Sequence, residues 1–153
     1  METLLQWNCQ GIHAKWEELQ HLVSSCNPVC ICLQEIMSGE STLISLRGYQ
    51  VHAHYGTFDT RPHGGVAVMV RHDVPCQPII LRTTLQVRAV RVGLKRPYTI
   101  ASVYLPPDNL DIRELEDLLQ QLPLPFLLLG DFNGRHHLWG DATPGVMPWS
   151  HCS

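Results

Sequence analysis

The chain has 153 residues, of which 44% are hydrophobic and 16% are charged, and its formal net charge at pH 7 is -3. This length fits one domain, since domains hold roughly 100 to 200 residues, and the composition excludes a disordered chain. The slight negative charge is not the basic excess of nonspecific nucleic-acid binders, so a phosphate substrate would have to meet local groups or a bound cation.

The beginning of the chain, METLLQWNCQ, has neither the basic nor the apolar region of a secretory signal, and no apolar run approaches the roughly 18 residues that span a bilayer. We therefore expect an intracellular protein that does not enter a membrane. In that setting the six cysteines should be reduced thiols. Cys30 and Cys32 lie within the apolar run VCICL, which favours core packing over zinc ligation.

Short segments rich in apolar and β-branched residues recur along the chain and are predicted to be strands. They cover residues 3–7, 29–33, 49–55, 65–70, 77–81, 85–92, 98–105 and 125–130. The segments 29–33 and 125–130 are apolar throughout and should lie inside a covered sheet. The segment 85–92 alternates between apolar and polar residues, so one of its faces should be buried and the other wet.

Two segments have helical spacing of their apolar residues, 13–26 and 109–122. Asn109 or Asp111 can cap the second predicted helix, and Pro123 ends it. Each helix precedes an apolar strand that ends in an acid, first Glu35 and then Asp131. A layered α/β fold places such strand ends where loops and functional sites collect.

Four of the predicted strands end in polar side chains of similar chemistry: Asn8, Gln34 with Glu35, Tyr104, and Asp131 with Asn133. Carboxylate and amide oxygens are hard ligands that suit Mg²⁺ or Mn²⁺, and Mg²⁺ needs only one or two carboxylates beside substrate phosphates. Glu35 and Asn8 would therefore be enough as the ligands that the protein supplies to the cation. Taken singly, each residue is also explained as a solvated strand end, a turn residue or a capped core aromatic. Their joint occurrence at successive strand ends favours a metal-dependent site.

Asp131 and Asn133 are two residues apart on an extended segment, so their side chains should point the same way. One could position a water or a proton while the other donates to or accepts from a phosphate group. His136 and His137 follow in the same segment. His13, His52, His54, His63 and His72 show no partner in the sequence and are expected to be surface groups.

Five motifs in order resemble those of the endonuclease/exonuclease/phosphatase superfamily: WNCQGI (7–12), LQE (33–35), GGVAVMVR (64–71), SVYLPP (102–107) and GDFNGRHHLWG (130–140). The variant is similar to the apurinic-like endonuclease domain of jockey-like non-LTR retrotransposons. The resemblance implies an α/β fold, a four-layered sandwich of two mixed sheets flanked by helices. It also implies Mg²⁺-dependent cleavage of double-stranded DNA in the nucleus, where the nick primes reverse transcription.

By the same resemblance, Asn8 and Glu35 serve the metal site and Tyr104 orients the reacting phosphate. Asp131 and Asn133 handle the nucleophile, the leaving group and the phosphate. His136 and His137 do not match the family's catalytic histidine, and we interpret them as substrate-binding residues that shape the loop after GDFN.

The resemblance covers residues 1–141, and residues 142–153 are expected to form an irregular tail outside the family pattern. No segment matches the family's closing Ser-Asp-His motif, so we expect a domain that is incomplete at its C-terminus, with reduced or no activity. Uncovered apolar surface should then promote association. The alternatives are a non-catalytic retrotransposon remnant and a phosphomonoesterase of the same superfamily.

Overall fold

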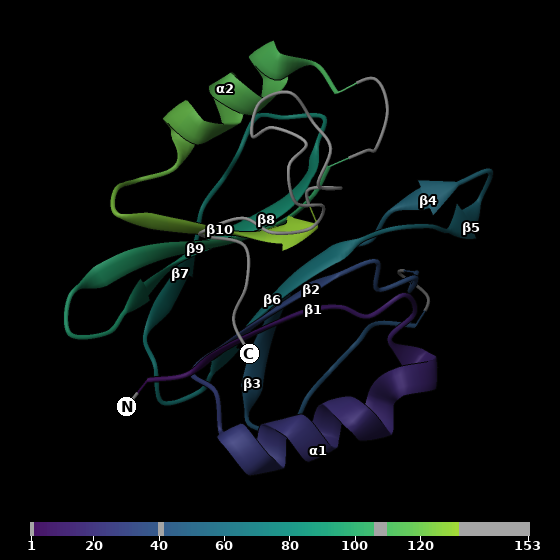
Figure 1. Cartoon of the computed structure of the whole chain (residues 1–153), viewed down its shortest axis with the longest axis vertical. Helices are drawn as coiled ribbons and strands as arrows, with labels where there is room; N and C mark the ends of the chain where they lie inside the picture. The colour runs from purple at the N-terminus through teal and green to yellow at the C-terminus, as the bar shows by residue number, and fades with distance from the viewer. Residues whose placement is uncertain (1, 40–41, 106–109, 132–153) are drawn as a thin grey trace, which may run out of the picture.

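The computed structural model describes residues 2–39, 42–105 and 110–131, and Asp131 is described by its backbone only. Two four-stranded sheets form its centre (Figure 1). The first has the order β1 (Leu4–Asn8), β2 (Cys30–Gln34), β6 (Val66–Arg71), β3 (Tyr49–His54). The second has the order β10 (Phe126–Asp131), β9 (Pro97–Tyr104), β8 (Gln86–Gly93), β7 (Cys76–Pro78).

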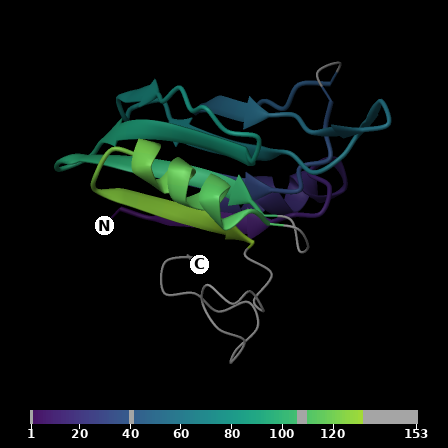
Figure 2. The same cartoon turned by 90° about the horizontal axis from the view of Figure 1, so that it is seen from above.

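The sheets are stacked between two helices, so the described chain has four layers (Figures 1 and 2). Helix α1 (Trp16–Cys26), preceded by the short helix η1 (His13–Lys15), packs on the outer face of the first sheet through residues that include Leu19. Helix α2 (Ile112–Gln121) covers the outer face of the second sheet through Leu115 and Leu118. The four-layered α/β sandwich expected from the sequence is confirmed.

A third apolar cluster fills the space between the sheets. Cys30 and Cys32 of β2 point into it together with Val68, Val90 and Ile100. Their predicted core packing is confirmed, because both thiol side chains are almost fully buried. In the residues that the structure describes, no disulfide joins two cysteines, and no three His, Cys, Asp or Glu side chains are placed to hold a metal.

Each sheet contains one parallel pair whose strands are joined through a helix. Strands β1 and β2 flank α1 and are parallel, with Asn8 opposite Gln34. Strands β9 and β10 flank α2 and are parallel, with Asp131 opposite Tyr104. Helix α2 begins after Asp111, whose side chain accepts a hydrogen bond from the backbone N–H of Arg113 at 2.9 Å. The antiparallel neighbours β6 and β8 make both sheets mixed.

Three details differ from the sequence predictions. Both faces of β8 carry buried residues, because Val87 and Ala89 pack toward α2 while Val90 and Val92 pack between the sheets. The expectation of one wet face is therefore wrong for this strand. Strand β7 ends at Pro78, before the apolar residues 79–81. The hairpin of β4 (Thr57–Phe58) and β5 (Arg61–Pro62) was not predicted, since each strand has only two residues.

No helix in the described part of the chain combines the length and the apolar character needed to cross a membrane.

Candidate active site

The candidate site lies where β1, β2, β9 and β10 end. Because β1 and β2 run parallel in register, Asn8 at the end of β1 lies beside Gln34, one residue before Glu35. The same relation holds in the second sheet, where the backbone of Asp131 lies opposite Tyr104. Each sheet therefore brings its two predicted strand-end groups to the end at which these strands terminate, and we call this end of the sheets the shared edge.

Buried hydrogen bonds hold the two edges against each other. The Gln34 side chain, which is fully buried, donates from Nε2 to Ser102 Oγ at 2.9 Å. Ser102 in turn donates from Oγ to the backbone carbonyl of Leu33 at 2.8 Å. Gln6 completes the set by donating to Gln34 Oε1 at 2.6 Å. Since Gln34 precedes Glu35 and Ser102 lies two residues before Tyr104, these bonds fix the spacing between the two strand ends.

A second connection runs through Gly65, which follows the β4–β5 hairpin. Gln86, which pairs with Tyr104 across β8 and β9, accepts a hydrogen bond from the Gly65 N–H through Oε1 at 2.6 Å. The Gly65 carbonyl accepts from the N–H of Ile36 at 3.2 Å. Gly65 has a φ of +89°, and an added Cβ would lie 2.7 Å from Ile36 Cγ1. This close approach requires glycine and ties the residue after Glu35 to the strand beside Tyr104.

Glu35 occupies a turn rather than a continued strand. Its φ of +52° is in the left-handed region, which turns the chain away from β2. Its carbonyl accepts a hydrogen bond from the Gly11 N–H at 2.8 Å, which fixes the segment after β1 against the segment after β2. The Glu35 side chain is partly exposed and is therefore accessible to a ligand.

Cys9 lies between the two metal-ligand candidates. Its thiol is buried and donates to the carbonyl of Gln34 at 3.4 Å. Burial, with a smaller contribution from the nearby charge of Glu35, raises the pKa of the Cys9 thiol to about 11. The thiol therefore stays protonated at neutral pH and is not a nucleophile there.

The donor groups at this edge suit a hard cation. Glu35 offers a partly exposed carboxylate, and the amide oxygen Oδ1 of Asn8 is buried at the end of the neighbouring strand. Oxygen donors with a single carboxylate are what Mg²⁺ accepts when a substrate phosphate supplies further ligands. The described residues provide no cluster of imidazoles or thiols of the kind that zinc prefers.

The predicted site residues are described to different extents. Asn8, Glu35 and Tyr104 lie at the shared edge, and Asp131 is placed there by its backbone. Asn133, His136 and His137 lie outside the described residues. The sequence did not single out Ser102, Gln86 or Gly65, whose partners are 21 to 69 residues away along the chain. No local spacing could have indicated them.

His52 and His54, which were expected to be surface groups, are only partly exposed. Both are partly buried on β3, and burial lowers the pKa of each imidazole, with the nearby Arg88 cation lowering it further. His13 also has a partner, because its Nε2 lies 2.9 Å from Ser38 Oγ.

The comparison with known protein families places this fold of two stacked mixed sheets. Residues 5–153 match the profile of the endonuclease/exonuclease/phosphatase family, so the chain belongs to it. The match extends past residue 141, and the domain boundary expected there stays a prediction.

The relatives of the chain are jockey-type retrotransposon proteins. It is 31% identical over 141 residues to the RNA-directed DNA polymerase from mobile element jockey of Drosophila funebris, covering 89% of this chain and 15% of that protein. It is 27% identical over 144 residues to the probable RNA-directed DNA polymerase from transposon BS of Drosophila melanogaster, covering 91% of this chain and 16% of that protein. The chain thus spans about one sixth of these relatives.

Solved structures share the fold. The endonuclease domain of TRAS1, a telomere-specific non-LTR retrotransposon, matches with a TM-score of 0.67 and 20% identity, over 92% of this chain and 63% of that one. An AP endonuclease from Archaeoglobus fulgidus matches with a TM-score of 0.65 and 15% identity, over 90% of this chain and 60% of that one.

Proposed function

We propose that this chain is the endonuclease domain of a jockey-like retrotransposon protein and that it hydrolyses a phosphodiester bond of double-stranded DNA with Mg²⁺ or Mn²⁺. The proposal rests above all on one observation: hydrogen bonds join the strand ends that carry Glu35 and Tyr104 across two sheets. Family membership and the retrotransposon relatives support the substrate class. Chromosomal DNA as the target makes the nucleus the place of action.

In this proposal Glu35 and Asn8 hold the divalent cation, which neutralises phosphate charge and stabilises the leaving oxygen. Tyr104 donates a hydrogen bond to a non-bridging oxygen of the reacting phosphate. Asp131 and Asn133 orient the attacking water and the leaving group, and His136 and His137 contact the substrate. Together these groups supply positioning and charge stabilisation, which dominate phosphate-transfer catalysis.

Within the 153 residues no Asp-His pair matches the family's general base, so we propose that this chain nicks DNA slowly when tested by itself. A positioned acid or base contributes roughly 10² to 10⁴-fold to rate. A full retrotransposon endonuclease would exceed this chain by about that factor.

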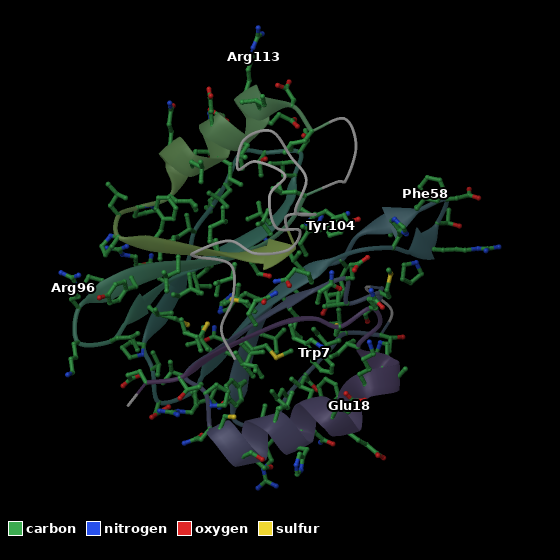
Figure 3. The ribbon with its side chains drawn as sticks, in the orientation of Figure 1. Trp7, Glu18, Phe58, Arg96, Tyr104 and Arg113 are labelled. Carbon is green, nitrogen blue, oxygen red and sulfur yellow. The ribbon has the colours of Figure 1, made fainter. Side chains whose placement is uncertain are left out.

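The test is nicking of supercoiled plasmid with Mg²⁺ or Mn²⁺, with EDTA as the metal-free control. Glu35→Gln should abolish the metal-dependent nicking, whereas Glu18→Gln, an exposed position on α1 far from Tyr104 (Figure 3), should leave it unchanged. Titration of Mn²⁺ into the same proteins, followed by calorimetry, should show weaker binding in Glu35→Gln alone. Equal nicking and equal Mn²⁺ affinity in both variants would refute the site.

The two alternatives predict different results in the same assay. A non-catalytic remnant gives no metal-dependent nicking in any variant. A phosphomonoesterase releases inorganic phosphate from a 3′-phosphorylated oligonucleotide but leaves the plasmid supercoiled.

A further inference from the structure

A groove opens at one side of the space between the sheets, and we call it the polar groove after its His52, His54 and Arg88 side chains, although its other lining residues are mostly apolar. Most of that space is apolar, but β3 turns His52 and His54 toward the second sheet, where Val68 and Val70 of the neighbouring β6 belong to the apolar cluster. The groove consists of two adjoining cavities, of about 320 Å³ beside His52 and about 100 Å³ beside His54. Ile79 and Arg88 line both.

The groove carries positive charge without a compensating acid. Neither cavity is lined by a carboxylate. The Arg88 guanidinium donates from Nε to the Ala53 carbonyl at 3.0 Å, and among the described residues its two terminal nitrogens donate to no protein group. An unneutralised guanidinium in a recess is an anion-binding group, because its planar fork matches two oxygens of a phosphate.

Arg91, three residues further along β8, shows the contrast. Its guanidinium donates to Thr99 Oγ1 and to the carbonyls of Pro123, Leu124 and Pro125, at distances from 2.8 to 3.2 Å. Its donors are thus used within the protein, where they fix the segment between α2 and β10. Arg88 is fixed at one nitrogen only, which orients the fork and leaves its far side available.

The groove leads to the candidate active site. His54 lies in the same cross-strand row as Gln34, because both residues pair with Val66 of β6. Arg88 pairs with Ser102 of β9, two residues before Tyr104. A nucleic-acid backbone that reaches the edge with Glu35 and Tyr104 can therefore continue into the groove beside Arg88.

We propose that this groove binds a backbone phosphate of the DNA next to the cleaved bond, with Arg88 as the anchoring cation and His52 and His54 as further donors. The inference rests on the proposed DNA endonuclease function. It also explains how a chain of net charge -3 could hold a polyanion, since local cations have to supply the attraction that the whole molecule lacks.

The test measures affinity for a fluorescent DNA duplex by anisotropy, in EDTA so that no cleavage takes place. Arg88→Gln should weaken binding by about three- to tenfold and lower the slope of log affinity against log salt by about one, the signature of one lost phosphate contact. Arg113→Gln is the matched control, because it removes the same charge from the exposed face of α2, where Arg113 points away from the body (Figure 3).

A second measurement uses pH. Around the imidazoles, β8 contributes the Arg88 cation and β7 contributes the Cys76 thiol, whose Sγ lies 3.8 Å from His52 Nε2. Protonation of His52 and His54 adds charge that attracts a phosphate, so affinity should rise as pH falls from 7.5 to 5.5. The double variant His52→Gln with His54→Gln should lose most of that rise. Urea denaturation of each variant checks that it is folded, and Arg88→Met, which removes the charge but keeps an unbranched apolar side chain, replaces Arg88→Gln if that variant unfolds.

Several outcomes would overturn the inference. These are no measurable duplex binding by the native chain, losses in Arg88→Gln and Arg113→Gln that agree within twofold, or binding of inorganic phosphate at Arg88 without any effect on the duplex. If Arg88→Gln does not weaken duplex binding but Glu35→Gln still abolishes nicking, the groove proposal is refuted and the proposed function is retained. Duplex binding that depends on Arg88, combined with nicking that does not depend on Glu35, refutes the proposed function instead.

Discussion

At the scale of single residues, Ser102 holds the candidate site together, although it has no place in the chemistry. Its hydroxyl accepts from Gln34 and donates to the Leu33 carbonyl across the two sheets. Both Gln34 and Ser102 are fully buried, so water cannot replace a lost partner. A buried polar group left without its partner costs roughly 1 to 3 kcal/mol.

Ser102→Ala should therefore lower the free energy of unfolding by about 1 to 3 kcal/mol and should also weaken Mn²⁺ binding at Glu35. Urea denaturation and calorimetry measure the two effects. Ser25→Ala is the control, because the Ser25 hydroxyl donates only to the His21 carbonyl on the exposed side of α1 and its loss should cost less than about 0.5 kcal/mol. Equal losses in the two variants would contradict a special role for Ser102.

The residue types at the site could be predicted from the sequence, but their division of labour could not. Asn8, Glu35 and Tyr104 were identified because polar groups at the ends of apolar strands are conspicuous in a sequence. Gln34 belongs to the same pattern, yet its amide is fully buried and bonds to Gln6 and Ser102. Whether a strand-end amide faces a ligand or the opposite sheet depends on which sheet stacks above it, and local spacing does not contain that information.

At the scale of elements, helix α1 ends at a residue whose conformation can be tested. Asn27 has φ 44° and ψ 55°, in the left-handed region, and its N–H donates to the Val23 carbonyl at 2.8 Å. Glycine and asparagine tolerate this cap, whereas a β-branched residue is strained by roughly 1 to 2 kcal/mol.

Asn27→Gly should therefore leave the thermal midpoint unchanged or slightly higher, and Asn27→Val should lower stability by about 1 to 2 kcal/mol. Calorimetric unfolding of the two variants and the native chain measures this. The Asn27 carbonyl, which accepts from Arg71 Nη1 at 2.7 Å, is common to all three proteins. A larger loss in the glycine variant than in the valine variant would show that the cap is not the determining feature.

The sequence predicted the long elements well because their apolar spacing is strong, and it failed where the signal is short or mixed. Both main helices and seven of the expected strands were identified within a few residues of their observed ends. The β4–β5 hairpin has two residues in each strand and turns at Asp59 and Thr60, which both have positive φ without being glycine. Such a turn lacks the Asn-Gly or Asp-Gly signal by which hairpins are normally found in a sequence.

At the scale of the whole molecule, the spacing of apolar residues does not predict that the two sheets stack on each other. In β8 the adjacent residues Ala89 and Val90 are both buried, one toward α2 and one toward the first sheet. A continuous apolar run predicts a strand that is covered on both sides. In β8, Arg88 and Arg91 interrupt such a run, and the fold accommodates them because each donates to an acceptor of its own. The family resemblance, rather than the alternation, indicated the second layer.

The large exposed apolar side chains of the described residues are Leu43, Phe58, Ile80 and Leu124, which come from four different segments. Association through uncovered apolar surface stays a prediction, and a scattered set is less favourable for it than a continuous patch.

The polar groove gives the molecule a stability that depends on pH. Folding lowers the pKa of both His52 and His54 below the value of 6.5 that they have in the unfolded chain, because burial and Arg88 disfavour the imidazolium. The unfolded chain therefore binds more protons than the folded chain as pH falls through 6.5. Stability from these two groups is complete above pH 6.5 and is lost progressively below it.

The urea midpoint should accordingly fall between pH 7.5 and pH 5.5, and the fall should be smaller in the double variant His52→Gln with His54→Gln. His21→Gln, an exposed position on α1, should keep the native dependence. If phosphate binds in the groove, it favours the protonated imidazoles, so a DNA duplex added in EDTA should reduce the acid loss in the native chain and leave the double variant almost unaffected. A double variant as sensitive to acid as the native chain would show that other groups set the pH dependence.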